Sequence, residues 1–173
     1  MTKNKLLLSA AMALALPQPS FAAAHVEAPS VADKLRDAVR GGIISLATVF
    51  TNAGAAIVTN RIIQAGTAPK NVGWGIGTTA AAVGDTALVT ESAPTTSGGR
   101  TVGTESRTTV TNTNDNYQVA GTVTAVSTLA ITEAGLFDAT TAGNCLIRSV
   151  FSAINVVSGD SIAFTFGLKF VPG

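Results

Sequence analysis

Residues 161–170 have the sequence SIAFTFGLKF, in which two kinds of side chain alternate without a break. Each even position carries a large apolar residue, and each odd position carries a small or polar one. Because successive side chains of a β-strand point to opposite faces, this pattern predicts a strand that buries one face in a hydrophobic core. A single strand cannot bury that face alone, so we expect other strands to pack with it.

The chain before this strand is rich in Thr, Val, Ser and Gly, with short alternating runs that are typical of strands. Turn signals separate the runs. The clearest are Asn114-Asp115-Asn116 and Ser158-Gly159-Asp160, whose residues tolerate left-handed backbone. The spacing predicts a mainly β fold, an antiparallel β-sandwich or jelly-roll-like domain over residues 66–173. The expected strands are 87–91, 107–113, 117–126, 129–137, 145–151, 154–157 and 162–170.

Residues 1–65 differ from this domain in composition, and we predict that they form an N-terminal arm, extended and partly helical. A short helix is expected in which Leu35 and Val39 lie one turn apart on one face, as candidate interface residues. Residues 43–50 are β-branched enough for a strand, whereas 53–63 suit a helix. The sequence alone does not decide how the segment is divided between the two.

A glycine-rich segment, residues 66–77, predicts a loop at the boundary between the two regions. Its centre, Gly73-Trp74-Gly75-Ile76-Gly77, lacks the spacing of a dinucleotide-binding turn and the Lys-Ser/Thr ending of a P-loop. Trp74 is the only tryptophan of the chain, and glycines on both sides let the backbone pack closely around it. We expect Trp74 to be an anchor, either in the core or at a subunit interface.

The composition is apolar and poor in charge. Hydrophobic residues make up 46% of the chain and charged residues only 12%, about half the usual charged share. A chain with so few charges is expected to cover much of its surface with partner subunits, which favours an assembly component. The net charge of +1 provides no basic field for steering towards nucleic acid, so we expect no nucleic-acid partner.

Catalytic and metal-binding residue types are scarce. His25 is the only histidine and lies far in sequence from any setting that would orient it, so a histidine triad or dyad is not expected. Cys145 is the only cysteine and lies in an apolar stretch, which predicts a passive core residue and no internal disulfide. With one of each, the chain lacks the ligands of an ordinary zinc site. We predict a protein that is not an enzyme and has no cofactor.

The acidic residues are scattered and form no calcium-binding loop. Asn112, Asn114 and Asp115 come nearest to one, and we interpret them as a hairpin turn. The spacing of Glu133, Asp138 and Asp160 leaves a glycosidase-type carboxylate pair open, but no motif identifies one.

Three stretches of the domain, ITEAGLFDA (131–139), GNCLIRSVF (143–151) and SGDSI (158–162), carry a resemblance to a known group of proteins. Together with GWGIGTTAAAVGDTAL (73–88), which has Asp85 before an expected strand, they resemble a pattern in virion structural proteins of tailed bacteriophages. The resemblance covers residues 72–170. It implies a place on the virion, and similar short β motifs occur in capsid decoration proteins, tail components and fibre modules.

The residues of these stretches also have a local interpretation. Gly135 inside an apolar strand, just before Phe137, indicates a bulge or a close approach of backbone. Asp138 is expected to begin a turn that Gly143-Asn144 completes, and Asp160 belongs to the turn before the last strand. We predict that Glu133 and Arg148 pair across neighbouring strands.

Among virion roles, we expect a capsid decoration or cement protein, located at the capsid surface. Its partners would be the major capsid protein and copies of itself, as a dimer or trimer. One alternative is a tail or fibre-attachment component that presents residues 92–103 to a host receptor. Another is a secreted bacterial β-sandwich that binds sugar or a surface polymer.

The first residues bear on this choice. Lys3 and Lys5 followed by the apolar run from Leu6 to Leu16 are typical of a secretory signal peptide, and cleavage after residue 22 would make the protein periplasmic or secreted. The run is well short of the roughly 20 residues that cross a bilayer as a helix, so stable membrane insertion is not expected. We favour an uncleaved arm that is buried in an assembly. The residues expected in that interface are Leu6, Leu7, Leu8, Leu14 and Leu16.

Overall fold

The computed structural model describes residues 47–92 and 99–171. The expected helix with Leu35 and Val39, the apolar run from Leu6 to Leu16 and His25 lie outside these residues. The described chain is mainly β, as predicted, with one helix among the strands. The elements are β1 (Ala47–Phe50), α2 (Asn52–Ile62), β2 (Asn71–Gly75), β3 (Glu91–Ser92), β4 (Thr101–Val102), β5 (Thr104–Thr108), β6 (Asn116–Thr124), β7 (Leu129–Phe137), β8 (Cys145–Val156) and β9 (Ser161–Lys169).

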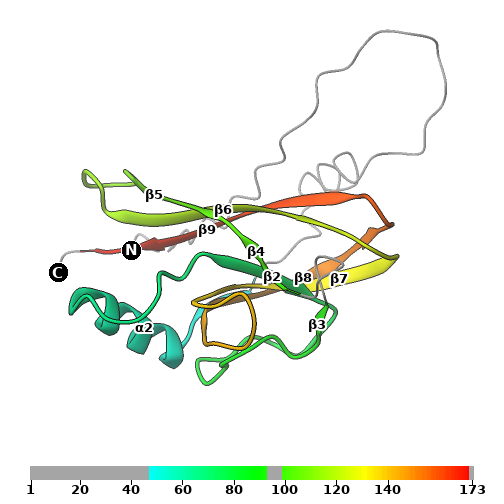
Figure 1. The fold of residues 1–173 in the computed structure, drawn as a ribbon, viewed down its shortest axis with the longest axis horizontal. Helices are drawn as coiled ribbons and strands as arrows, with labels where there is room; N and C mark the ends of the chain where they lie inside the picture. Colours follow the sequence, from blue (N-terminus) through cyan, green and yellow to red (C-terminus); the bar gives the residue numbers. More distant parts are fainter. Residues whose placement is uncertain (1–46, 93–98, 172–173) are drawn as a thin grey trace, which may run out of the picture.

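The strands form two sheets, and every pairing is antiparallel. The larger sheet has the order β1-β8-β7-β2-β3, with β4 also paired to β2, and the smaller has the order β5-β6-β9. Figure 1 shows the sheets as two layers, with α2 at one end. The predicted antiparallel sandwich is therefore confirmed. No helix in the described part of the chain is long and apolar enough to cross a membrane.

The strand β9 has the alternation that its sequence predicts. Ile162, Phe164 and Phe166 are buried between the sheets, whereas the odd-numbered residues face outward. The ladder with β6 is regular over all nine residues of the strand. Phe170 departs from the pattern, because the strand ends at Lys169 and the Phe170 side chain is 52% exposed.

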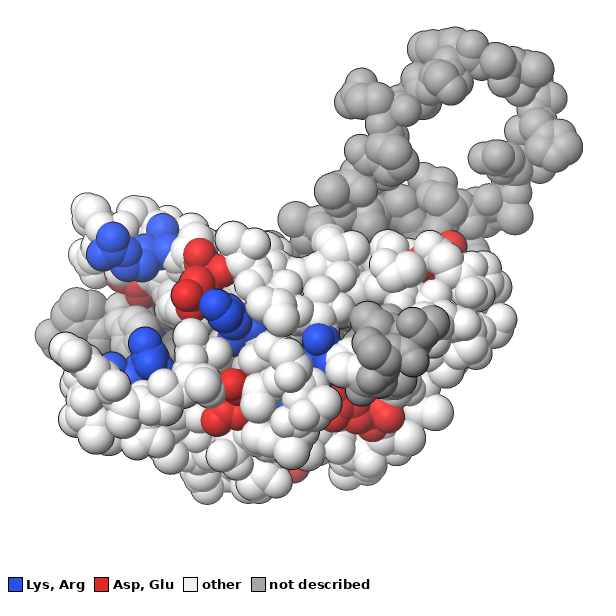
Figure 2. All heavy atoms as spheres, viewed as in Figure 1, with Lys and Arg blue, Asp and Glu red and all other residues white. Residues whose placement is uncertain are grey.

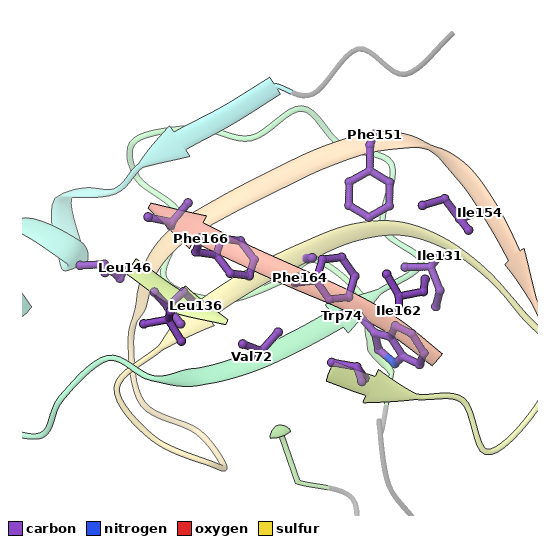
Figure 3. Packing of buried hydrophobic residues seen from close by; sticks show 14 of the residues in the cluster. Val72, Trp74, Ile131, Leu136, Leu146, Phe151, Ile154, Ile162, Phe164 and Phe166 are labelled. Atoms are coloured by element: carbon purple, nitrogen blue, oxygen red, sulfur yellow. The ribbon is translucent and has the colours of Figure 1, made fainter. Parts of the chain in front are cut away.

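Aromatic side chains from both sheets fill the middle of the core (Figure 3). Phe164 of β9 packs edge-on against Trp74 of β2, with ring centroids 6.4 Å apart, and its other neighbours are Phe151 and Phe166. Trp74 is fully buried, so of its two expected positions the core is correct and the subunit interface is wrong. Burial of large apolar surface from both sheets supplies the main force that holds the layers together.

The expected boundary loop at 66–77 is partly wrong, because residues 71–75 form β2, a fully buried strand between β7 and β3. Its glycines permit this position. A Cβ at Gly75 would lie 2.3 Å from the Thr90 carbonyl oxygen, so a strand with side chains there would not fit. The expected strands 145–151 and 154–157 are one continuous strand, β8. Most of 87–91 and 107–113 forms loop and turn.

The segment left undecided in the sequence is a short strand followed by a helix. Strand β1 pairs with β8, and Thr51 then caps α2 because its Oγ1 accepts a hydrogen bond of 2.8 Å from the Gly54 amide. The helix packs on β8 so closely that a Cβ at Gly54 would lie 2.5 Å from the Leu146 carbonyl oxygen. Ile57 of the helix joins the hydrophobic core. The described end of region 1–65 therefore packs on the larger sheet.

Candidate functional site

The predicted pair of Glu133 and Arg148 is present on the face of the larger sheet that points away from the aromatic core. Arg148 lies opposite Gly135 in the β7–β8 ladder, one diagonal step from Glu133. The Arg148 Nη2 is 2.8 Å from Glu133 Oε2, and Nε donates to the same oxygen at 3.0 Å. Both side chains are 0% exposed. Two charges buried so completely need further polar partners, since neither has water to solvate it.

Backbone amides supply those partners to Glu133. Its Oε1 accepts hydrogen bonds from the amides of Gly77 (3.1 Å) and Thr90 (2.7 Å), and its Oε2 accepts one from Val89 at 3.1 Å. The neighbouring Thr132 hydroxyl donates to the Gly77 carbonyl oxygen at 2.8 Å. One carboxylate therefore fastens both ends of the loop 76–90 to the sheet.

Arg148 fastens the middle of the same loop. Its Nη1 is 2.7 Å from Asp85 Oδ2, and its Nη2 donates to the Thr79 carbonyl oxygen at 2.8 Å. Burial acts to raise the pKa of Asp85, but the Ala82 amide and the Arg148 guanidinium outweigh it and hold that pKa below its ordinary value. Together, Asp85, Glu133 and Arg148 form a cluster that we name the loop clamp. The clamp connects the 76–90 segment to β7 and β8.

A second arginine, Arg100, ties down the turn between β7 and β8. Its Nε and Nη2 form a bidentate pair with Glu91, at 2.7 and 2.8 Å. Its Nη1 donates to the carbonyl oxygens of Ala139 and Ala142, and its guanidinium carbon lies 3.3 Å from the centre of the Phe137 ring. Arg100 is not among the site residues predicted from the sequence. It lies in the polar segment 92–103, and no motif there marks it.

The two turns predicted at residues 138–144 and 158–160 are confirmed. Asp138 Oδ1 accepts a hydrogen bond from the Asn144 amide at 2.7 Å, and Gly143 takes the left-handed φ of +67°. Asp160 Oδ2 accepts from the Val157 amide at 2.9 Å, beside Gly159 with φ +92°. Gly135 is closely approached by side chains and not by backbone, because a Cβ there would lie 2.9 Å from the Phe137 ring and 3.1 Å from Leu88 Cδ2. The register shifts of β7 fall at other residues, between Ile131 and Glu133 and between Leu136 and Phe137.

The structure does not bring the three candidate carboxylates together. Glu133 is buried as a member of the loop clamp, and Asp138 and Asp160 lie beyond opposite ends of β8, a strand of 12 residues. At about 3.3 Å per residue that strand separates them by tens of ångströms. Residues 47–92 and 99–171 also contain no group of three or more His, Cys, Asp or Glu residues that could hold a metal ion. Cys145 is buried, and burial is the main cause that raises the pKa of its thiol to about 12.

The surface instead offers an apolar groove at the end of the sandwich where α2 and the end of β9 lie (left in Figure 1). Its volume is about 330 Å³, and Arg61 and Glu105 are its charged residues. Ile62, on its α2 side, is 76% exposed. Within the lining, the Tyr117 hydroxyl donates a hydrogen bond of 3.1 Å to Glu105 Oε2. The lining residues are Ile57, Val58, Arg61, Ile62, Ala68, Pro69, Glu105, Tyr117, Leu146, Leu168 and Phe170.

Charges are sparse around the groove and elsewhere. Figure 2 shows small separate groups of charged side chains on one face of the molecule, with uncharged surface between them. Exposed apolar side chains next to a groove of this size are typical of a surface that a partner covers. We therefore take the groove as the candidate functional site, with the loop clamp as a rigid support elsewhere on the domain.

No family model, curated protein or solved structure matches the chain. The comparisons therefore assign neither a family nor a function to it. A functional proposal rests on the residues, contacts and surface described above.

Proposed function

We propose that this chain is a non-enzymatic structural protein of a tailed-bacteriophage virion, of the capsid decoration or cement type. The observation that carries the proposal is the loop clamp. Asp85, Glu133 and Arg148 come from three of the four stretches that resemble virion proteins, and they meet in one buried cluster. These three residues lie far apart in the sequence pattern but meet at one contact. This convergence supports the interpretation that the pattern encodes one structural unit, which the chain would share with virion proteins.

The surface supports a binding role in an assembly. A chain with 12% charged residues and an open apolar groove gains free energy by covering that groove with another subunit. In this proposal the groove binds the major capsid protein, and the clamped loop keeps the domain rigid while it is bound. A preorganised domain loses little conformational entropy when it docks.

The proposal extends to the rest of the fold. In this proposal the sandwich is of the jelly-roll type, and the part of the 1–65 region that precedes Ala47 is an arm over neighbouring subunits. The apolar run from Leu6 to Leu16 would be buried there, where it would add hydrophobic area to the contact. An arm of this kind loses conformational entropy only when it binds.

Copy number and position on the particle test the proposal. Quantitative mass spectrometry of purified virions, together with electron microscopy of particles carrying a tagged chain, should find it in hundreds of copies on filled heads. Particles that lack the chain should lose their DNA at a lower temperature than complete ones. A few copies at the tail would assign the chain to a tail or fibre component instead. Absence from particles, with an intact mass that lacks residues 1–22, would refute any virion role.

A further inference from the structure

The strand β9 is an edge of the smaller sheet. It pairs with β6 on one side, and no other strand within 47–92 or 99–171 pairs with its second side. All nine residues of β9 lie in one uninterrupted register with β6, so the open side is long and has no bulge. An edge of this length presents a row of backbone donors and acceptors to any strand that approaches it.

Two flanking bonds show which residues point to the open side. The Phe170 amide donates to the Asp115 carbonyl oxygen at 2.8 Å, and the Ala125 amide donates to the Asp160 carbonyl oxygen at 2.8 Å. Antiparallel ladders alternate between hydrogen-bonded and non-bonded pairs, so the even-numbered residues of β9 bond to β6. The odd-numbered residues, with Thr165 at their centre, therefore direct their N–H and C=O groups away from β6.

This edge has few of the features that usually block strand addition. Natural edges carry charges, prolines or bulges, or are very short. Strand β9 contains no proline, and its register with β6 has no shift. Its one charge is Lys169 at the far end, where Nζ donates to the Thr111 hydroxyl. The odd-numbered residues before it, Ser161, Ala163, Thr165 and Gly167, are small, so they leave room for a neighbouring strand.

We propose that β9 pairs antiparallel with β9 of a second copy, so that the two small sheets become one continuous sheet. A two-fold axis through Thr165 is the register that pairs all nine residues and sets odd-numbered residues opposite odd-numbered ones. Thr165 then faces its own copy, Ala163 faces Gly167, and Ser161 faces Lys169, so no like charges meet. On the buried face Phe164 lies opposite Phe166, which extends the aromatic row of the core across the interface.

This pairing is independent of where the chain acts, and it is tested on the purified full-length protein. Sedimentation equilibrium should show a dimer. Thr165→Pro removes a donor that faces the open side and no donor of the ladder with β6, so the dimer should weaken at least about tenfold. Circular dichroism and thermal unfolding of the same variant check that it folds. A wild-type protein that stays monomeric, or a folded Thr165→Pro variant that dimerises as well as wild type, would overturn the proposal.

The register is tested by charge. Thr165→Lys and Thr165→Glu each place like charges at the two-fold axis, and each should weaken the homodimer by roughly fivefold or more. Mixing the two variants should restore dimers that native mass spectrometry identifies as heterodimers. Thr122→Lys is the matched control, because Thr122 is exposed and lies opposite Ala163 on the inner strand β6, where the added charge should leave the dimer intact. If the lysine and glutamate variants form no heterodimers when they are mixed, pairing through Thr165 is refuted.

Discussion

The Glu133 carboxylate and the Arg148 guanidinium meet at 2.8 Å, and neither side chain has any solvent exposure. The pair belongs to neighbouring strands, but its other hydrogen bonds run to the loop 76–90. A buried ion pair of this kind is weak evidence for stability in itself, because the desolvation cost offsets the attraction. Its contribution is to define one position for a long loop in which Leu88 is the only large apolar side chain that is buried.

Removal of the Glu133 charge should destabilise the fold strongly. Glu133→Gln keeps the size of the side chain but leaves Arg148 with Asp85 as its one ionic partner, and a buried pair broken in this way typically costs about 3 kcal/mol or more. Urea unfolding followed by tryptophan fluorescence measures the change through Trp74. Glu105→Gln is the control, because Glu105 is exposed and its loss should cost well under 1 kcal/mol. Equal losses in the two variants would show that the loop clamp does not support the fold.

A methyl group at Gly77 should have a similar effect for a steric reason. A Cβ there would lie 2.4 Å from Glu133 Oε1 and 2.8 Å from the Val89 Cβ, so the loop must shift away from the carboxylate. We expect Gly77→Ala to lower the free energy of unfolding by about 2 kcal/mol and to speed amide hydrogen exchange at Val89 and Thr90.

Gly84, in the same loop, provides the matched control. An added Cβ there would meet no atom within 4 Å, so Gly84→Ala should be neutral or stabilise slightly. If both alanine variants were equally stable, the close contact between Gly77 and Glu133 would not hold in solution.

The free energy of unfolding should depend on pH through the protonation of Asp85. Its pKa in the folded state is held below the ordinary value of 3.8, so the folded state favours the charged form. The stabilisation is complete above the unfolded pKa and is lost as the pH falls through the folded pKa. The stability difference between wild type and Asp85→Asn should therefore shrink as the pH is lowered below about 4. Urea titrations at a series of acidic pH values measure it, and a difference that does not change with pH would contradict the assignment.

The sequence predicts the strands β6 and β9 well because their apolar residues alternate with a period of two. The strand β7 is also predicted, although register shifts interrupt its alternation. The sequence does not predict β2, since Gly73 and Gly75 weaken any strand signal. That strand buries Val72 and Trp74 in the core, and its other face accepts only glycine at position 75, where a Cβ would meet Glu133 and the Thr90 carbonyl oxygen. The requirement arises from the tertiary packing, which a local pattern does not contain.

The contacts of the candidate site were likewise predictable only in part. The pairing of Glu133 with Arg148 was predictable, because opposite charges on adjacent strands come within reach of each other. The amide partners of Glu133 were not, since a backbone N–H is the same at every residue. Arg100 was also missed, because its role depends on the Phe137 ring and on carbonyl oxygens of a distant turn. The apolar groove is assembled from α2 and both sheets, so no single segment of the sequence indicates it.

If the groove binds the capsid shell as proposed, a charge on its apolar rim should weaken that binding. Ile62→Asp places a carboxylate on an exposed side chain that lines the groove, and burying it against a shell protein would require its desolvation. Asn60→Asp adds the same charge to the same helix outside the groove lining, so it controls for charge alone. Purified particles that lack the chain should bind the Asn60→Asp variant as they bind wild type, and the Ile62→Asp variant at least about tenfold more weakly. Equal binding of both variants in a co-sedimentation assay would show that the chain docks through another surface. A charge at the rim of a groove that stays uncovered does not change the affinity for the particle.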